Sequence, residues 1–119
     1  MKKTILLIDD FQNTLFVTEM TLQNDYKILK AKSGQEAMDI MKNNIPDLII
    51  TDYNMPVMNG YDLVKEIKKN PDFKRIPIFV LSTETKQELK AQILELGVTA
   101  WIQKPFKLDI LKQLIKKAI

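Results

Sequence analysis

The stretch Leu48-Ile49-Ile50-Thr51-Asp52-Tyr53-Asn54-Met55-Pro56 decides how the rest of the chain is interpreted. Its first residues are apolar and β-branched, which is typical of a buried strand. The Met55–Pro56 pair predicts an irregular loop directly afterwards, because proline has no N–H group and restricts the residue before it. Asp52 is therefore expected at the carboxyl end of a strand, the edge where ligands bind in open parallel sheets. An isolated aspartate there would be interpreted as a loop cap, but Asp52 is accompanied by other polar strand ends.

Length and composition indicate one globular domain. The chain has 119 residues, of which 45% are hydrophobic and 28% charged, a balance typical of a folded soluble protein. No apolar run approaches the ~20 residues that a membrane-spanning helix requires. The run Thr4–Ile8 is too short for a secretory signal and ends in two aspartates, which indicates a first strand. We therefore expect a cytoplasmic protein without a membrane segment.

The residue types that are missing restrict the chemistry. The chain contains no cysteine and no histidine, which excludes disulfides, thiol chemistry and the usual zinc sites. Any catalysis or metal binding must use carboxylates, hydroxyls and lysine. The formal net charge is only +3, and lysines recur at positions 65, 68, 69, 112, 116 and 117 within helical patterns. No aromatic residues interleave these lysines to stack bases, so we interpret them as solvated and expect no nucleic-acid binding by this chain alone.

Strand-like and helix-like segments alternate five times along the chain. The predicted strands are Ile5–Ile8, Tyr26–Leu29, Asp47–Thr51, Ile76–Leu81 and Val98–Ile102. The predicted helices cover Phe11–Asn24, Gly34–Asn43, a segment around Val64, a segment around Ile93 that Gly97 ends as a left-handed cap, and a segment from Leu108 to Ala118. This alternation predicts a doubly wound α/β fold, with a five-stranded parallel sheet and helices on both faces.

Apolar positions at helical spacing predict which side of each helix faces the core. In the first helix we expect Phe16, Val17 and Met20 to point inward. The second helix carries an apolar group on one side, and similar spacing marks the third and fourth helices: Ala37, Ile40 and Met41, then Tyr61, Val64 and Ile67, then Leu89, Ile93 and Leu96. The final helix has an inward stripe of Leu108, Leu111, Ile115 and Ala118. Such stripes are core far more often than partner-binding surfaces.

Polar residues come at the ends of four predicted strands, all at the same edge of the sheet. Asp9 and Asp10 follow the first strand, Asp52 the third, Ser82 the fourth and Lys104 the fifth. Three carboxylates this close would raise one another's pKa and destabilise the fold unless a cation neutralised them. Mg²⁺ suits such a site, because it prefers carboxylates, waters and a phosphate oxygen as ligands. Lys104 supplies further positive charge.

This group of side chains indicates phosphoryl chemistry. A carboxylate beside Mg²⁺ and a lysine can attack phosphorus as a nucleophile and form an aspartyl phosphate. The metal and the ammonium group then stabilise the charge on the equatorial oxygens during the transfer. Phosphoryl transfer to Asp52 is therefore the favoured reaction.

Four motifs resemble the receiver domain of bacterial two-component response regulators. They are Ile8-Asp9-Asp10, Asp52-Tyr53-Asn54-Met55-Pro56 with Gly60 beyond it, Leu81-Ser82-Thr83, and Lys104-Pro105-Phe106. The match covers essentially the whole chain, and its nearest likeness is to the single-domain chemotaxis regulators (CheY-like). The resemblance implies one receiver domain over residues 1–119 with the flavodoxin-like (βα)₅ fold.

The resemblance also implies which residues act in the reaction. Asp52 would accept a phosphoryl group from a sensor histidine kinase or a phosphotransfer protein. Asp9, Asp10, Asp52 and the backbone carbonyl of Asn54 would hold Mg²⁺. Lys104 would pair with the phosphoryl group.

Two further features of the family concern switching and the loop after the fifth strand. Ser82 would donate a hydrogen bond to the phosphoryl group. Trp101 occupies the switch position, where the family usually has tyrosine or phenylalanine. The resemblance further predicts a cis peptide bond between Lys104 and Pro105, because X–Pro is the one bond where the cis form lies low in energy.

Three other functions compete with this interpretation. A Mg²⁺-dependent aspartyl-phosphate phosphatase of the haloacid-dehalogenase type would need a second aspartate two residues after the nucleophile, where this chain has Asn54. A flavodoxin-type binding module would need small hydroxyl and glycine residues after the first strand, where Asp9 and Asp10 would repel a phosphate without a metal. An inactive receiver is disfavoured, because every position that the chemistry needs is filled.

We therefore predict a phosphorylation-dependent signalling switch, a phosphoprotein of a two-component system or a phosphorelay. It would catalyse only its own phosphorylation and dephosphorylation and would not be an enzyme acting on a diffusible substrate. The sequence contains no output domain, so we expect the signal to pass to a downstream protein on the face formed by the fourth helix, the fifth strand and the fifth helix. Phosphorylation would draw the Ser82 hydroxyl towards the phosphoryl group and let Trp101 move inward.

Overall fold

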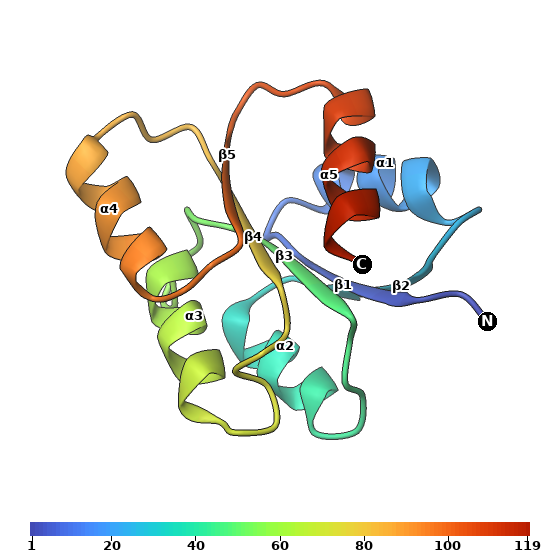
Figure 1. The fold of residues 1–119 in the computed structure, drawn as a ribbon, viewed down its shortest axis with the longest axis horizontal. Helices are drawn as coiled ribbons and strands as arrows, with labels where there is room; N and C mark the ends of the chain where they lie inside the picture. The colour runs from blue at the N-terminus through green and yellow to red at the C-terminus, as the bar shows by residue number, and fades with distance from the viewer.

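A computed structural model describes residues 1–119. Five parallel strands form one sheet in the order β2-β1-β3-β4-β5 (Figure 1). The strands are β1 (Thr4–Ile8), β2 (Lys27–Ala31), β3 (Leu48–Asp52), β4 (Ile78–Ser82) and β5 (Ala100–Gln103). The helices are α1 (Gln12–Leu22), α2 (Gly34–Met41), α3 (Gly60–Lys69), α4 (Gln87–Glu95) and α5 (Leu108–Ala118). Strands and helices alternate strictly, which confirms the predicted doubly wound (βα)₅ fold.

The helices cover both faces of the sheet, with α1 and α5 on one face and α2, α3 and α4 on the other (Figure 1). Side chains of a strand point alternately to the two faces. Leu6 and Ile8 of β1 therefore join the cluster under α2, α3 and α4, while Ile5 and Leu7 join the cluster under α1 and α5. Such a strand must be apolar at nearly every position, as the sequence is.

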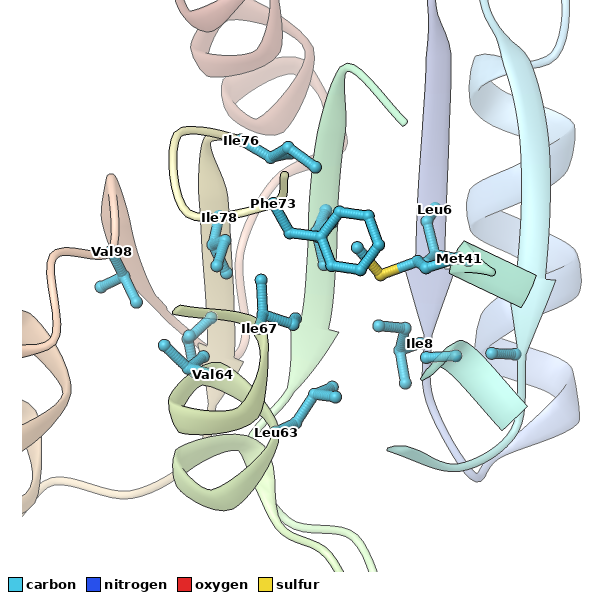
Figure 2. Packing of buried hydrophobic residues seen from close by; sticks show 14 of the residues in the cluster. Leu6, Ile8, Met41, Leu63, Val64, Ile67, Phe73, Ile76, Ile78 and Val98 are labelled. Atoms are coloured by element: carbon cyan, nitrogen blue, oxygen red, sulfur yellow. The ribbon is translucent and has the colours of Figure 1, made fainter. Parts of the chain in front are cut away.

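The larger core cluster contains 16 buried residues and lies between the sheet and α2, α3 and α4. Figure 2 shows Leu63, Val64 and Ile67 of α3 directed towards the strands, with the Phe73 ring against Met41 of α2. These contacts fix α3 on the sheet, and α3 begins next to the end of β3. The core thus positions the loop that carries Tyr53 to Asn59.

A capping box marks the start of α3, and a glycine with positive φ follows the end of α4. The Asn59 side chain accepts a hydrogen bond from the Asp62 N–H at 2.9 Å, and the Asp62 carboxylate accepts one from the Asn59 N–H at 3.4 Å. This capping box satisfies two of the free donors of the first turn. Gly97 follows α4 with a φ of +90°, which confirms the left-handed position predicted for this glycine.

The predicted inward face of α1 is wrong. Phe16, Val17 and Met20 are 59%, 52% and 52% exposed, and the helix buries Leu15, Thr18 and Leu22 instead. Apolar residues lie on all sides of this helix, so its periodicity did not distinguish the two faces. A threonine is tolerated on the buried side because its hydroxyl donates to the Thr14 carbonyl at 2.9 Å.

Several predicted strands began and ended too early in the chain. β3 runs to Asp52 and β4 to Ser82, so these residues are the last of their strands and do not follow them. β2 is likewise Lys27–Ala31 in place of Tyr26–Leu29, and β5 is Ala100–Gln103 in place of Val98–Ile102. The reason is that ladder pairing continues through polar residues, with Asp52 opposite Leu81 and Ser82 opposite Gln103. None of the helices has the length and apolar character that crossing a membrane would require.

Candidate functional site

The predicted site residues meet at the carboxyl edge of the sheet. Asp9 follows β1, Asp52 ends β3, Ser82 ends β4, and Lys104 follows β5. Asp9, Asp52 and Ser82 are buried, with 5%, 8% and 0% of their surface exposed, whereas Asp10 lies exposed at the rim. A buried carboxylate is rare without a cation. The pairing of these groups therefore determines what the site can do.

Lys104 is the cation within this group. Its Nζ lies 2.8 Å from Asp52 Oδ1 and 4.0 Å from Asp9 Oδ2. The Lys104 N–H also donates to the Ser82 carbonyl at 2.7 Å, which holds the loop after β5 against the end of β4. The Lys104–Pro105 peptide bond is cis, as predicted.

The environment of Asp9 penalises its charged form. Burial raises the pKa of this carboxyl above its ordinary value, and the nearby carboxylates of Asp52 and Asp10 raise it further. The hydrogen bond that Asp9 Oδ1 accepts from the Phe11 N–H at 2.9 Å and the charge of Lys104 oppose this increase only in part. Burial is the largest cause, so the site favours a second cation next to Asp9.

The three aspartates form a cluster of metal-ligand type. Asp9, Asp10 and Asp52 each offer a carboxylate oxygen, and these oxygens all lie within 4.8 Å of one another. Two of the three residues are buried and one is exposed, which leaves one side open to water. Several oxygen donors with an open side fit Mg²⁺, which keeps water ligands and binds through one or two carboxylates. Asn54, whose carbonyl was predicted to join them, lies two residues beyond Asp52 in the exposed loop.

Ser82 and Trp101 were predicted to respond to the site. The Ser82 Oγ accepts a hydrogen bond from the Glu84 N–H at 2.9 Å, which leaves the hydroxyl proton free to be donated elsewhere. Trp101 is half-buried in the middle of β5, and its Cα pairs with Val80 of β4. Val80 is two residues before Ser82 on β4, so Trp101 lies that far from the carboxyl end of the sheet, on the edge strand β5.

Sequence reasoning gave no role to Tyr53 or Glu84. The Tyr53 ring contacts the Trp101 ring, with 5.8 Å between the centroids and 59° between the planes. Burial raises the pKa of the Tyr53 hydroxyl, and the carboxylates of Glu84 and Asp62 raise it further, so the hydroxyl stays neutral and can act as a donor. The only sequence signal for Tyr53 was an aromatic residue directly after Asp52.

The comparison with protein families matches residues 5–116 to the response regulator receiver domain. Among curated relatives, CheY1 of Helicobacter pylori is 37% identical over 112 residues, which cover 92% of this chain and 90% of that protein. The sensor histidine kinase TmoS of Ectopseudomonas mendocina is 32% identical over 97% of this chain, but this chain spans only 12% of TmoS. Matches thus occur both to proteins of this size and to segments of much longer ones.

Solved structures agree with this assignment over the full chain. The chemotaxis response regulator CheY4 of Vibrio cholerae superposes with a TM-score of 0.92 at 32% identity, covering 100% of both chains. The receiver domain of the sensor histidine kinase PA1611 from Pseudomonas aeruginosa PAO1 gives a TM-score of 0.88 at 26% identity, covering 98% of this chain and 97% of that one. That domain has a magnesium ion coordinated in its active site cleft.

Proposed function

This chain belongs to the family of response regulator receiver domains, and we propose that it is a phosphorylation-dependent switch with Asp52 as the phosphoryl acceptor. The observation that carries the proposal is the 2.8 Å contact between Lys104 Nζ and Asp52 Oδ1, inside a cluster that also contains Asp9 and Asp10. Asp52 thus has a cation within hydrogen-bond distance and oxygen donors for a metal beside it. A buried aspartate with a purely structural role would need the cation but not the additional oxygen donors.

The proposed reaction transfers a phosphoryl group to a carboxylate oxygen of Asp52. That oxygen forms a bond to phosphorus while the bond from phosphorus to the donor atom breaks, and the electron pair leaves with the donor. Lys104 Nζ already lies beside Asp52, so a small movement brings it to a new phosphoryl oxygen. The free hydroxyl proton of Ser82 supplies a second donor from β4. Water ends the phosphorylated state by attacking the same phosphorus: a new bond forms from the water oxygen to phosphorus, the bond from phosphorus to Asp52 breaks, and inorganic phosphate leaves.

Asp9, Asp10 and Asp52 are the side chains that would hold Mg²⁺, together with the Asn54 carbonyl by resemblance to the family. When bound, the metal supplies positive charge to the phosphoryl oxygens and to the three carboxylates. The magnesium ion in the PA1611 receiver domain supports this choice of metal. The raised pKa of Asp9 also supports a metal here. Burial and the neighbouring carboxylates destabilise the charged form of Asp9, and a bound cation would offset that cost.

In this proposal the protein catalyses only its own phosphorylation and dephosphorylation and is not an enzyme for a separate substrate. The alternative is a phosphatase of the haloacid-dehalogenase type, which needs a proton-transferring group two residues after the nucleophile. Asn54 holds that position, and its amide cannot donate or accept a proton in catalysis. Failure to release phosphate from p-nitrophenyl phosphate would distinguish the switch from the phosphatase.

The proposed partners are proteins on both sides of the transfer. The donor is a sensor histidine kinase or a phosphotransfer protein of a two-component system or phosphorelay. In keeping with this, two of the relatives are histidine kinases that contain a segment similar to this chain. The downstream protein binds the face of α4, β5 and α5. Each of these elements has an apolar side chain that is at least partly exposed: Leu94 in α4 (43%), Trp101 in β5 and Ile110 in α5 (47%). A cytoplasmic location and no nucleic-acid partner belong to the same proposal.

The phosphoryl acceptor can be tested by intact-mass measurement. Wild-type protein incubated with Mg²⁺ and acetyl phosphate should gain the mass of one phosphoryl group, and Asp52→Asn should not. Asp47→Asn is a matched control, because Asp47 is an exposed aspartate at the opposite edge of the sheet, where it accepts a hydrogen bond from the Thr4 N–H at 2.8 Å. A full-occupancy adduct on Asp52→Asn would overturn the assignment.

A further inference from the structure

Tyr53 connects two strands of the sheet that are not neighbours. It directly follows Asp52 at the end of β3, whereas Trp101, its ring partner, lies on β5. β4 separates these strands (Figure 1), so their backbones are two strand spacings apart, about 9–10 Å. The ring contact at 5.8 Å between centroids is therefore a direct link between β3 and β5 that does not follow the hydrogen-bonded ladder through β4.

The backbone of Tyr53 is held on both sides. Its N–H donates to the Leu81 carbonyl of β4 at 2.8 Å, and its carbonyl accepts from the Gly60 N–H at the start of α3, also at 2.8 Å. These bonds fix the Tyr53 backbone against β4 and α3, so its ring extends from a defined position directly after Asp52.

The Tyr53 ring also lies near the groups that surround the site. The carboxylates of Glu84 and Asp62 both act on its hydroxyl, and the ring packs against the larger core cluster, as Trp101 does. Glu84 belongs to the loop whose N–H donates to Ser82 Oγ, so any shift of that loop changes the surroundings of the same ring. Tyr53 thus faces both the acceptor strand and the loop that follows Ser82.

We propose that Tyr53 is the residue that couples Asp52 to Trp101, its ring setting the position of the indole on the α4, β5 and α5 face. This rests on the proposed role of Asp52 as phosphoryl acceptor. The coupling passes through the contact of the two rings, in addition to the path through the Ser82 hydroxyl. A receiver with a small residue after its acceptor lacks this path, so the proposal concerns the Tyr53 and Trp101 pair of this chain.

The test uses the emission of Trp101, the single tryptophan of the chain. Emission is recorded with Mg²⁺ before and after beryllofluoride, a stable phosphoryl analogue. Tyr53→Phe keeps the ring and should keep the wild-type response. Tyr53→Leu and Tyr53→Met remove the ring, and each should change the equilibrium between the two indole positions by about two- to tenfold, the usual strength of an aromatic pair. The beryllofluoride response should shrink accordingly.

Matched controls separate coupling from general packing. Tyr26→Leu removes a half-buried tyrosine that packs on the opposite face of the sheet, and its response should equal that of wild type. Thermal melts identify variants that do not fold, and Tyr53→Met then replaces Tyr53→Leu. An unchanged response in the ringless variants that fold would overturn the proposal, as would loss of the response in Tyr53→Phe.

The outcome is separable from that of the proposed function. Intact-mass measurement with acetyl phosphate reports the phosphoryl adduct on each variant without reference to Trp101. Absence of an adduct on wild type would refute the role of Asp52. A normal adduct with an unchanged Trp101 response in Tyr53→Leu and Tyr53→Met refutes the coupling alone. A normal adduct with a reduced response in both variants supports it.

Discussion

Gly60 packs directly against the backbone of Asp52. A β-carbon at position 60 would lie 3.0 Å from the Asp52 carbonyl oxygen and 2.9 Å from the Tyr53 Cα. The first residue of α3 must therefore be glycine for the acceptor strand to end where it does. The Gly60 N–H also donates to the Tyr53 carbonyl at 2.8 Å, so the close approach and the hydrogen bond support each other.

Gly60→Ala should destabilise the fold and displace Asp52, because both contacts of the new methyl group are with backbone atoms that cannot rotate away. We expect a loss of about 1–3 kcal/mol, the usual cost of overpacking, in spite of alanine's better helix propensity. Gly34→Ala is the matched control at the first residue of α2. Its β-carbon would meet the flexible Met58 side chain, at 2.5 Å from the sulfur, which can move aside. Urea denaturation measures the free energy of unfolding of both variants. A larger loss for Gly34→Ala than for Gly60→Ala would contradict this account.

Asp9→Asn should stabilise the metal-free protein at neutral pH. Burial raises the pKa of Asp9, so the folded state binds this proton more tightly than the unfolded state, and stability falls as pH rises from the ordinary value of 3.8 through the raised folded value. The amide removes this loss and can still accept the Phe11 N–H. We expect a gain of about 1 kcal/mol, seen as a melting temperature about 3–6 °C higher.

The pH dependence of the melts provides the control for this prediction. At a pH below 3.8 the wild-type carboxyl is protonated in both states, so the advantage of Asp9→Asn should vanish there. Added Mg²⁺ should stabilise wild type more than the variant. A lower melting temperature for Asp9→Asn at neutral pH would show that the charge of the carboxylate, in its bond to the Phe11 N–H and beside Lys104, stabilises the fold by more than its burial costs.

The buried face of α1 can be tested by two neighbouring substitutions. Leu15 is 5% exposed and belongs to the core under α1 and α5, whereas Phe16 is 59% exposed. Leu15→Ala should cost about 2–4 kcal/mol and Phe16→Ala less than about 0.5 kcal/mol, because only the first leaves a cavity. Chemical denaturation measures both. A larger loss for Phe16→Ala than for Leu15→Ala would favour the face that the sequence alone predicted.

The sequence predicted the site better than it predicted this helix, for a physical reason. The ends of β1 and β3 are recognisable because a run of buried apolar residues stops at a carboxylate, at Asp9 and at Asp52. In α1 both faces are apolar, so only packing against the sheet selects Leu15 over Phe16. The contact between Tyr53 and Trp101 was also beyond prediction, because it depends on how two side chains reach across β4.

Val57 is the one non-glycine residue with a positive φ, +68°, and its side chain is fully exposed. A β-branched residue is strained in this region, where asparagine is tolerated. Val57→Asn should therefore stabilise the protein by about 1 kcal/mol, while Val57→Ile, which keeps the branch, should change little. Urea midpoints measure both. A stabilising Val57→Ile would mean that a side-chain contact, and not the backbone, decides the preference at this position.

Lys104 balances two carboxylates, so its loss should be most costly where no metal is present. Lys104→Met keeps the length of the side chain but leaves Asp52 and Asp9 without their cation. Removing one partner of a buried pair costs about 3–5 kcal/mol, and because the lysine side chain is 24% exposed, water reduces our expectation to about 1–3 kcal/mol. Adding Asp52→Asn to this variant should recover most of the loss, because the uncompensated charge is then removed.

Saturating Mg²⁺ should likewise stabilise Lys104→Met more than wild type, since the metal supplies the missing charge. Denaturation of the four proteins of this double-mutant cycle, with and without Mg²⁺, measures both effects. A double variant as unstable as Lys104→Met would show that lysine packing, and not its charge, stabilises the edge of the sheet.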